Sequence, residues 1–503
     1  MTEEWCCEKL ENLKIKENRM STLAEIRGRL NETPNLEAKV TNRLLTSSEI
    51  YDCLEVEDDD ESPLDANADP MDLVSDILSI CMANLSLRQN DLPRLLDRAL
   101  QHKRSRIRSL ALNAILKELQ NQISDVSLGA AISDDLLRHI LKALQESETQ
   151  LGSPAVKILT IVLPEHLQKS YVKETLLEAL KGSEVVKCRV YELAVNLSKS
   201  SPATLEQVAF ILDHALSELD NDDVLLQVNI LEILASLAEQ NHGIIFLEKQ
   251  QVFDVISKKV ELIEQNPLDR LLVPGIMKFF GKISSIQPQK IITGYPRMIQ
   301  CLFECLHSGD VSLLPAAFDT LANLCQSQQG VILLEENYSS DVKESMEDYS
   351  SYLRNLPSEL KNRAFSSLEL IFTFDEAVSN QVSEILHKWF QHLNDGQNNM
   401  QFLMDFCRNP FPDIKISTLN LIGATCLYAW GIDALKNTAG FLEYLLDRKI
   451  EFDKEAKYAK YCVIKILAES CAFDIETNNQ LRTYVNEGPY YVQAIMDVAV
   501  EGN

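Results

Sequence analysis

The sequence predicts an all-α fold built as one curved solenoid of stacked helices. From about residue 71 onward, apolar residues recur at three- and four-residue spacing in segments of about 12–18 residues, and this is helical periodicity. Strict two-residue alternation is missing, so no sheet is predicted. The segments also resemble one another at regular intervals, which is the pattern of a repeat array.

The composition agrees with this fold class and limits the partners. The chain has 503 residues, 46% hydrophobic and 24% charged, so most of it can bury a core. Gly and Pro number only 16 each, which favours helices over turn-rich structure. Lys and Arg number 48 against 75 Asp and Glu, a formal charge of −27, so we expect no nucleic-acid partner. No apolar run approaches the ~18 residues that span a bilayer, so we expect no membrane partner.

Residues 1–70 depart from the repeat pattern and are predicted to form an atypical N-terminal segment. The first residues carry acid where a signal peptide carries base, so we expect a cytoplasmic protein that can also be nuclear. Six acidic residues between Glu55 and Glu61, followed by Ser62-Pro63, repel one another and resist burial. We therefore expect an acidic disordered loop at about residues 52–70; an acidic hook for a basic partner is the alternative.

Residues 71–480 are predicted to form the repeat array. In the segment 223–238, Asp222 or Asp223 can cap the first turn of a helix. The apolar positions of this segment form one stripe: Val224, Val228, Leu231, Leu234 and Leu237.

A pattern of apolar, two residues, polar, apolar closes successive helices and sets the repeat length. The copies are Ile115-Leu-Lys-Glu118-Leu, Leu193-Ala-Val-Asn196-Leu, Ile233-Leu-Ala-Ser236-Leu, Phe279-Phe-Gly-Lys282-Ile and a weaker Thr320-Leu-Ala-Asn323-Leu. The polar members are 78, 40, 46 and 41 residues apart, and the first step is twice 39. A period of about 40–47 residues is typical of HEAT and armadillo repeats, so the array is predicted to be HEAT/armadillo-like.

Two later segments are predicted to lie outside the regular helices. Residues 337–355, rich in Ser, Asp and Glu, are predicted to form a loop. Residues 481–503 are predicted to form a C-terminal capping tail, because Gly488-Pro489 should stop the last helix. Tyr484, Tyr490 and Tyr491 should then pack back on the last repeat and cover its open end.

The sequence offers no constellation typical of an enzyme. A phosphate-binding glycine loop, a His-Glu-x-x-His zinc motif and a nucleophile elbow are all missing. The 12 cysteines contain no C-x-x-C pair and are expected to be buried free thiols. His387 and His392 are five residues apart and would not share a helix face. We expect no catalytic residue, no metal and no cofactor, with an enzyme on a helical scaffold as an alternative that the residues leave open.

The densest basic cluster is Lys103-Arg104-Ser-Arg106-Ile-Arg108. It can be read as a nuclear-import signal or as a contact for an acidic partner. The alternative is the loop and first turn of a repeat helix, with Ile107 and Leu110 facing inward.

One polar residue per repeat falls on the helices that are expected to line a groove. In armadillo grooves such residues bind extended or helical partners; solvation of an outward face or hydrogen bonding between repeats is the alternative. With neighbouring charged residues they define a predicted partner-binding set, which we call the groove face: Glu192, Asn196, Glu232, Ser236, Lys278, Lys282, Asp319 and Asn323.

Several stretches resemble the 26S proteasome non-ATPase regulatory subunit 5 family. Within the array they are Lys187-Cys-Arg-Val-Tyr191-Glu-Leu, Val273-Pro274-Gly-Ile-Met-Lys-Phe279-Phe280-Gly281, Asn409-Pro-Phe411-Pro412-Asp and Phe441-Leu-Glu-Tyr444-Leu-Leu-Asp447-Arg448. The ending is the most distinctive part: Asp453-Lys454-Glu-Ala-Lys457-Tyr-Ala-Lys460-Tyr461, Leu481-Arg482-Thr483-Tyr484, Glu487-Gly488-Pro489-Tyr490-Tyr491-Val492 and Ala499-Val500-Glu501-Gly502. The resemblance covers about residues 71–503, and little matches before residue 71.

This resemblance implies an assembly chaperone for the 19S regulatory particle base of the 26S proteasome. Members of the family hold the C-terminal domain of an AAA-ATPase subunit, 26S proteasome regulatory subunit 7, in a precursor that also contains regulatory subunit 4 and non-ATPase regulatory subunit 2. They leave before the proteasome is complete. Periodicity alone would equally allow a generic solenoid adaptor, of the nuclear-transport or phosphatase-scaffold type.

Overall fold

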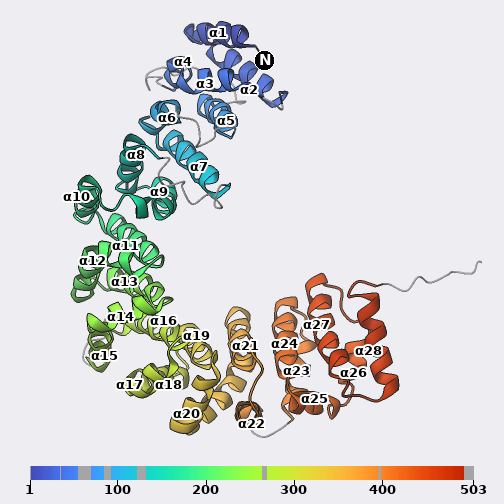
Figure 1. Ribbon diagram of the computed structural model, residues 1–503. Coiled ribbons are helices and arrows are strands. Elements are labelled where there is room, and N and C mark those ends of the chain that lie inside the picture. Colours follow the sequence, from blue (N-terminus) through green and yellow to red (C-terminus); the bar gives the residue numbers. More distant parts are fainter. Residues whose placement is uncertain are drawn as a thin grey trace, which may run out of the picture. The chain divides into compact units, whose positions relative to one another are not determined.

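The computed structural model describes residues 2–33, 36–54, 69–83, 92–121, 132–221, 223–262, 269–394 and 398–491, and all regular structure in these ranges is helical (Figure 1). The chain divides into two compact units, Met1–Asn221 and Asp222–Asn503.

The first unit contains α1 (Glu3–Asn12), α2 (Arg19–Asn31), α3 (Ala38–Thr46), α4 (Ser48–Asp52), α5 (Pro70–Met82), α6 (Leu92–Leu100), α7 (Ser105–Asn121), α8 (Asp134–Leu144), α9 (Thr149–Val162), α10 (Ser170–Ala179), α11 (Glu184–Ser198) and α12 (Pro202–Ser217). The second unit begins with α13 (Val224–Leu237), α14 (Asn241–Lys249), α15 (Val252–Leu262), α16 (Val273–Ser284), α17 (Pro288–Gly294), α18 (Pro296–His307), α19 (Leu314–Cys325) and α20 (Gln328–Asn355). It continues with α21 (Ser358–Phe372), α22 (Asn380–Gln391), α23 (Asn399–Cys407), α24 (Pro412–Thr425), α25 (Ala429–Lys436), α26 (Phe441–Leu446), α27 (Lys454–Ser470) and α28 (Ile475–Glu487).

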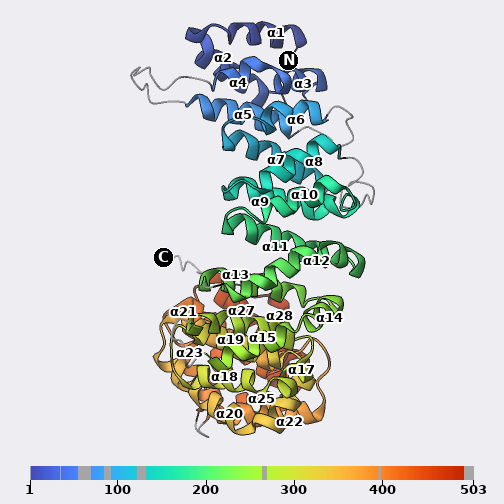
Figure 2. The same ribbon diagram turned by 90° about the vertical axis from the view of Figure 1, so that its left-hand side faces the viewer.

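The helices of the first unit form two rows. In one row α2 packs on α5, α5 on α7, α7 on α9 and α9 on α11; in the other α3 packs on α6, α6 on α8 and α8 on α10. Contacts of α6 with α7 and of α8 with α9 join the rows, and Figure 2 shows the successive pairs stacked one below another. Because these contacts join neighbouring pairs of helices, the unit is a solenoid.

The second unit repeats this plan. Helices α13, α16, α19, α21, α24 and α27 pack in succession, and α15, α18, α20 and α22 form the opposite row. Figure 1 shows the first of these rows on the inner side of the bend that the helices of this unit follow. The predicted all-α, HEAT/armadillo-like solenoid is therefore confirmed, and the structure divides the predicted single array into two units of the same plan.

The sequence repeat corresponds to one row of helices in each unit. Its five copies lie near the carboxyl ends of α7, α11, α13, α16 and α19. Helix α9 packs between α7 and α11, which accounts for the first step of 78 residues as two repeats.

Helix α13 illustrates how the sequence forms these elements. The Asp223 carboxylate caps it, accepting the backbone N–H groups of Leu225 and Leu226 at 2.9 and 3.1 Å. Leu231 and Leu234 of the predicted stripe are buried, and Leu237 with them. Val224 and Val228 are only half-buried, and Leu226 and Ile230 complete the buried face instead.

The loop predicted at residues 337–355 is wrong, because α20 crosses this stretch. The helix is interrupted only at Tyr338, whose φ and ψ are −136° and 30°. Val342, Met346, Tyr349 and Leu353 are fully buried at spacings of four, three and four residues. The Ser, Asp and Glu residues between them dominate the composition, but this apolar stripe determines the structure.

The N-terminal residues are helical as well. Helices α1 to α4 lie within the segment predicted to be atypical, and α2 and α3 pack on α5. The boundary near residue 71 stays a prediction. The acidic run at residues 55–61 lies outside the described residues.

The last helix ends where Gly488-Pro489 was predicted to stop it. Helix α28 ends at Glu487, and Gly488 follows with φ 84°. The Arg448 guanidinium lies 3.6 Å from the ring centre of Tyr484 and 5.3 Å from that of Tyr491, and it donates to the carbonyl oxygen of Gly488 at 2.8 Å. Tyr484 is buried, whereas Tyr490 is 53% exposed. The capping role of residues 481–503 stays a prediction, and residues 492–503 lie outside the described ranges.

All 12 cysteines are free thiols. The buried ones are Cys6, Cys53, Cys81, Cys301, Cys305, Cys325, Cys407 and Cys426, as predicted. The expected burial is wrong for Cys471, which is exposed, and only partly right for Cys7, Cys188 and Cys462, which are half-buried. Burial raises the pKa of the Cys81 and Cys426 thiols to about 12.

Candidate partner-binding surface

The groove face is divided between the two units: α11 carries two members in the first unit, and α13, α16 and α19 carry six in the second. On each helix its two members are four residues apart and therefore share one face. Glu192, Glu232 and Lys278 are exposed. The other members are half-buried: Asn196, Ser236, Lys282, Asp319 and Asn323.

Part of this set is engaged in bonds between repeats. The Lys282 ammonium donates to the Ser236 hydroxyl at 3.2 Å and forms an ion pair with Glu239. Both partners belong to the segment at the end of α13, so this contact links α16 to the preceding repeat. The alternative of hydrogen bonding between repeats therefore holds for Ser236 and Lys282.

Asp319 and Asn323 on α19 are also engaged. Arg363 on α21 donates from Nε to Asp319 Oδ1 at 3.2 Å, and its Nη2 pairs with Oδ2. Asn323 Oδ1 accepts from Gln326 Nε2 at 3.3 Å. The bidentate pair between Asp319 and Arg363 fixes both side chains in one geometry.

Glu192, Glu232 and Lys278 form no ion pair with any residue that the structure describes. Glu192 acts electrostatically on Arg189, one turn earlier on α11. Burial lowers the pKa of Arg189, and the charge of Glu192 partly opposes that shift. The Arg189 guanidinium donates to the backbone carbonyls of Glu146 and Ser147, in the segment between α8 and α9.

Sequence reasoning missed Arg363, Glu239 and Thr320 as partners within this surface. Thr320 Oγ1 donates to the carbonyl oxygens of Met277 and Ala316 at 3.0 and 2.7 Å and so ties α19 to α16. Arg363 follows Asp319 by 44 residues, one repeat length, so a search for complementary charges at the repeat period could have found this pair.

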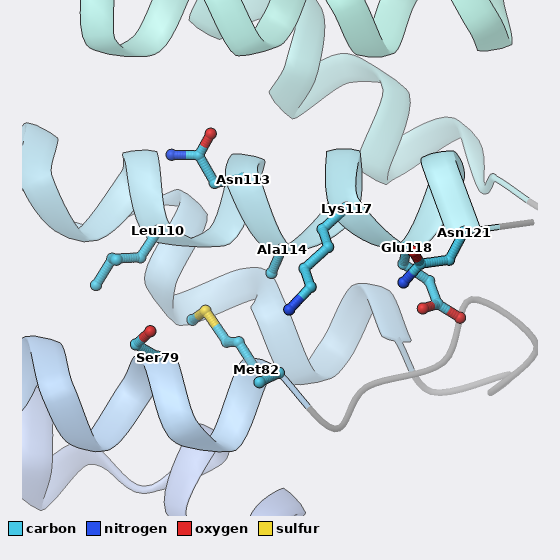
Figure 3. Close-up of a pocket in the computed structure, with 9 residues that line it drawn as sticks. Ser79, Met82, Leu110, Asn113, Ala114, Lys117, Glu118 and Asn121 are labelled. Carbon is cyan, nitrogen blue, oxygen red and sulfur yellow. The ribbon is translucent and has the colours of Figure 1, made fainter. Parts of the chain in front are cut away.

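A cleft opens between α5 and α7 in the first unit, with a volume of about 160 Å³ (Figure 3). Lys117 of α7 extends toward Met82 of α5, and Ser79, Asn113, Glu118 and Asn121 also line the cleft. Glu118 is the first polar member of the repeat pattern. Among the described residues that line this cleft, no nucleophile is paired with a base.

A buried polar cluster lies near the end of the second unit and includes Tyr444 and Asp447 of the stretch Phe441–Arg448. Glu451 is 3% exposed and accepts from the Tyr444 hydroxyl and the Lys415 ammonium, each at 2.8 Å. Burial raises the pKa of Tyr444. Lys460 is 1% exposed and donates to the Asp447 carbonyl at 2.5 Å. These groups satisfy one another, so the cluster holds α24, α26 and α27 together.

The basic cluster at residues 103–108 lies at the start of α7. Ile107 is buried and Leu110 half-buried, as the helix-turn interpretation predicts. Arg104 donates to the Leu54 carbonyl at 3.2 Å, and Arg106 pairs with Asp72 at 2.8 Å. Arg104 and Arg106 are therefore bonded to other segments of the first unit.

Among the described residues, no three His, Cys, Asp or Glu side chains gather closely enough to hold a metal ion. His387 lies against Trp430, with ring centres 5.0 Å apart. Within the same ranges, no helix is long and apolar enough to cross a membrane.

Comparison with known proteins places the chain among proteasome proteins. The family model described as "Proteasome non-ATPase 26S subunit" matches residues 2–503. The 26S proteasome non-ATPase regulatory subunit 5 of Drosophila melanogaster is 40% identical over 100% of this chain and 99% of its own length. The proteins of the same name from Bos taurus and Homo sapiens are each 29% identical over 81% of this chain and 82% of their own lengths.

Among solved structures the similarities are weaker. Kap121p bound to Pho4p is 14% identical, with a TM-score of 0.43 over 96% of this chain and 56% of that one. A designed armadillo repeat protein in complex with the peptide (KR)4 is 14% identical, with a TM-score of 0.38 over 51% of this chain and 98% of that one. From the match along residues 2–503 and the 40% identity over its full length, the chain belongs to the proteasome non-ATPase 26S subunit family, with the 26S proteasome non-ATPase regulatory subunit 5 proteins.

Proposed function

We propose that the chain is an assembly chaperone for the 19S regulatory particle base. In this proposal the groove face binds the C-terminal domain of one AAA-ATPase subunit, 26S proteasome regulatory subunit 7. Regulatory subunit 4 and non-ATPase regulatory subunit 2 are present in the same base precursor. The chain acts by binding and not by catalysis, in the cytoplasm and also in the nucleus, and it leaves before the mature proteasome forms.

The observation that carries this proposal is the unpaired acid on the groove face of each unit. Glu192 on α11 and Glu232 on α13 are exposed and form no ion pair with a described residue. In the second unit Ser236, one turn after Glu232 on α13, is held by its bond to Lys282 of the next repeat, so Glu232 projects from an ordered surface. Such acids attract a basic partner surface and speed its encounter, while a few desolvated side chains set the dissociation rate.

Charge reversal of Glu192 together with Glu232 should weaken binding of the ATPase domain and reduce its dependence on salt. A loss of at least about tenfold in affinity is expected, because two attractive contacts become repulsive. Fluorescence anisotropy with labelled ATPase C-terminal domain at several salt concentrations measures both quantities.

The matched control is Glu174→Lys with Glu384→Lys, which changes the net charge equally. These acids are also exposed, one in each unit, on α10 and α22 of the opposite rows. The control should keep nearly full affinity, and so should reversal of the acids at residues 57–61. Full affinity of the Glu192/Glu232 variant would eliminate the groove face.

Binding of the ATPase C-terminal domain also implies a mechanism. If the chain covers that domain, an immature ATPase cannot dock on the 20S core, and no nucleotide chemistry is needed from this chain. In a mixture of purified components, the chain and the 20S core should therefore compete for the ATPase domain. Simultaneous and unweakened binding of both partners would rule out blocking.

A pull-down from cell extract separates this proposal from a generic solenoid adaptor. Recovery of free ATPase subunits without the 20S core supports the assembly-chaperone proposal. Recovery of transport cargo or a phosphatase, with no ATPase subunit, supports the adaptor.

A further inference from the structure

A second cleft in the first unit has the opposite charge to the chain as a whole. It lies among α6, α7 and α8, and its volume is about 370 Å³. Its lining residues are Leu100, Gln101, Arg108, Leu112, Arg138, His139, Lys142, Ala143 and Glu146, and we call it the α6–α8 cleft. Three permanent cations face one carboxylate here, in a chain whose formal charge is −27.

Two of these cations lack a carboxylate partner. Arg138 and Lys142 are both exposed, lie four residues apart on α8 and form no ion pair with any described residue. Like charges at this spacing repel each other on a helix. An anion held between them would remove that repulsion.

The two arginines of the cleft are also held in place. The Arg138 guanidinium stacks on the ring of Tyr171, 4.0 Å from its centre, which leaves the N–H edges of the guanidinium open to a carboxylate. Arg108 donates from Nη1 to the carbonyl oxygens of His102 and Lys103 at 3.0 and 3.1 Å. Because these donors are already ordered, less side-chain entropy is lost when an anion binds.

Two acids at the cleft, Asp97 and Glu146, are occupied. Asp97 accepts from Gln101 at 2.5 Å and lies 3.5 Å from His139 Nε2. Glu146 lies 3.5 Å from Arg108 Nη2. These contacts leave the edges of Arg138 and Lys142 as the open positive groups of the cleft.

The floor of the cleft is apolar. Leu100, Leu112 and Ala143 line it and are themselves buried, whereas Arg138 and Lys142 are exposed. A cleft of this size accepts a few side chains, and a long polyanion such as a nucleic acid would be repelled by the acidic remainder of the chain. An apolar floor with a cationic rim suits a peptide that alternates carboxylates with small apolar side chains.

We propose that the α6–α8 cleft binds a short acidic peptide segment of a partner protein, with carboxylates on Arg138 and Lys142 and an apolar side chain on the floor. None of the groove-face residues takes part, so this site is independent of the proposed ATPase contact.

The test uses the full chain and a short fluorescein-labelled peptide of alternating Glu and Ala with one central Leu. Fluorescence anisotropy should show saturable binding that weakens with salt, and the same peptide with Gln for Glu should not bind. Arg138→Gln with Lys142→Glu should weaken binding at least about tenfold. The exposed single change Lys142→Gln should weaken it about threefold.

The matched control is Lys157→Gln with Lys181→Glu, which lowers the net charge equally. Both lysines lie in the first unit outside the cleft, Lys157 exposed on α9 and Lys181 paired with Glu178 at the surface. This control should keep the affinity of the unchanged chain. Circular dichroism checks that each variant is folded.

Three results would overturn the proposal. Equal weakening by the control would mean that only net charge matters. Unchanged affinity in folded Lys142→Gln and in the double variant would place the peptide elsewhere. Binding of a single-stranded oligonucleotide of equal charge with similar affinity would mean that the cleft selects any polyanion.

Discussion

Lys460 carries an ionisable group that folding removes from water. Its side chain is 1% exposed on α27, and its ammonium lies 4.9 Å from the ring centre of Tyr444. Burial lowers the pKa of Lys460 to about 8, although Glu451 and Asp447 oppose this shift. The residue is therefore one place where pH should act on stability.

The sign of that effect follows from proton binding. Between pH about 8 and the ordinary lysine value of 10.5, the unfolded chain keeps the proton on Lys460 and the folded chain loses it. Because the unfolded state binds more protons, the contribution of Lys460 to stability rises with pH across this window and is lowest below it. Lys460→Met should lack this rise. Urea unfolding at several pH values measures the difference between the two chains, and parallel stability profiles would contradict the assignment.

Individual residues also show what the sequence could and could not predict. The repeat pattern placed Ser236, Lys282 and Asn323 on helices that pack in succession, and the structure has them on α13, α16 and α19. It could not show that Lys282 reaches back to Ser236, since that depends on rotamers and on the spacing between helices. Rotamers and the spacing between helices therefore decide whether a groove residue is available to a partner.

At the scale of the element, a glycine recurs where one helix turns into the next. A Cβ at Gly330 would overlap the carbonyl oxygen of Leu324, six residues earlier, at the junction of α19 and α20. The same relation holds for Gly243 with Leu237 and for Gly431 with Thr425. This tight junction lets α14, α20 and α25 start close against the preceding helix.

Gly330→Ala should therefore destabilise the second unit by about 1–3 kcal/mol, since backbone atoms must shift to admit the methyl group. Gly28→Ala is the control, because nothing lies within 4 Å of a Cβ at that position of α2. There alanine should stabilise the helix by about 0.5–1 kcal/mol. Thermal unfolding measures both, and equal effects of the two changes would be inconsistent with the tight junction.

Leu234 on α13 tests how far damage spreads from one helix. It is fully buried, so Leu234→Asn loses about 1.5–3 kcal/mol of apolar burial and adds an amide that lacks a partner. In a solenoid each helix depends mainly on its neighbours, so hydrogen exchange should show protection lost around α13 and its packing partner α16. Uniform loss from end to end of the chain would instead indicate one cooperative core.

The helices themselves were predictable from the sequence where the apolar stripe was clear, as in α13. The prediction failed at α20, because composition was weighed above periodicity there. It also gave no sign of the glycine junctions, since Gly243, Gly330 and Gly431 are not evenly spaced along the chain.

At the scale of the whole molecule, the sequence predicted the solenoid class but not its division after Asn221. The repeat pattern is the same on both sides of this point, so no periodicity marks it. The unit boundary follows from long-range packing, which a linear pattern does not encode.

The end of the second unit provides the prediction at this scale. Truncation before residue 481 removes Leu481 and Tyr484, which are buried. It also removes the rings of Tyr484 and Tyr491 that lie against Arg448. The last face of α27 should then be open to water, so the truncated chain should be less soluble and should associate at lower concentrations. Light scattering during concentration measures this. A truncated chain as soluble as the full one would show that the tail is no cap.

The scattered thiols have a practical consequence. Cys6 lies on α1, Cys81 on α5, Cys325 on α19 and Cys407 on α23, all buried. Burial raises the pKa of these thiols, and only the thiolate reacts with an alkylating reagent. Each cysteine can therefore react only when its own helix pair opens. The order in which these cysteines are alkylated would therefore show which helix pairs open first when a partner binds or dissociates. No engineered label is needed for this measurement.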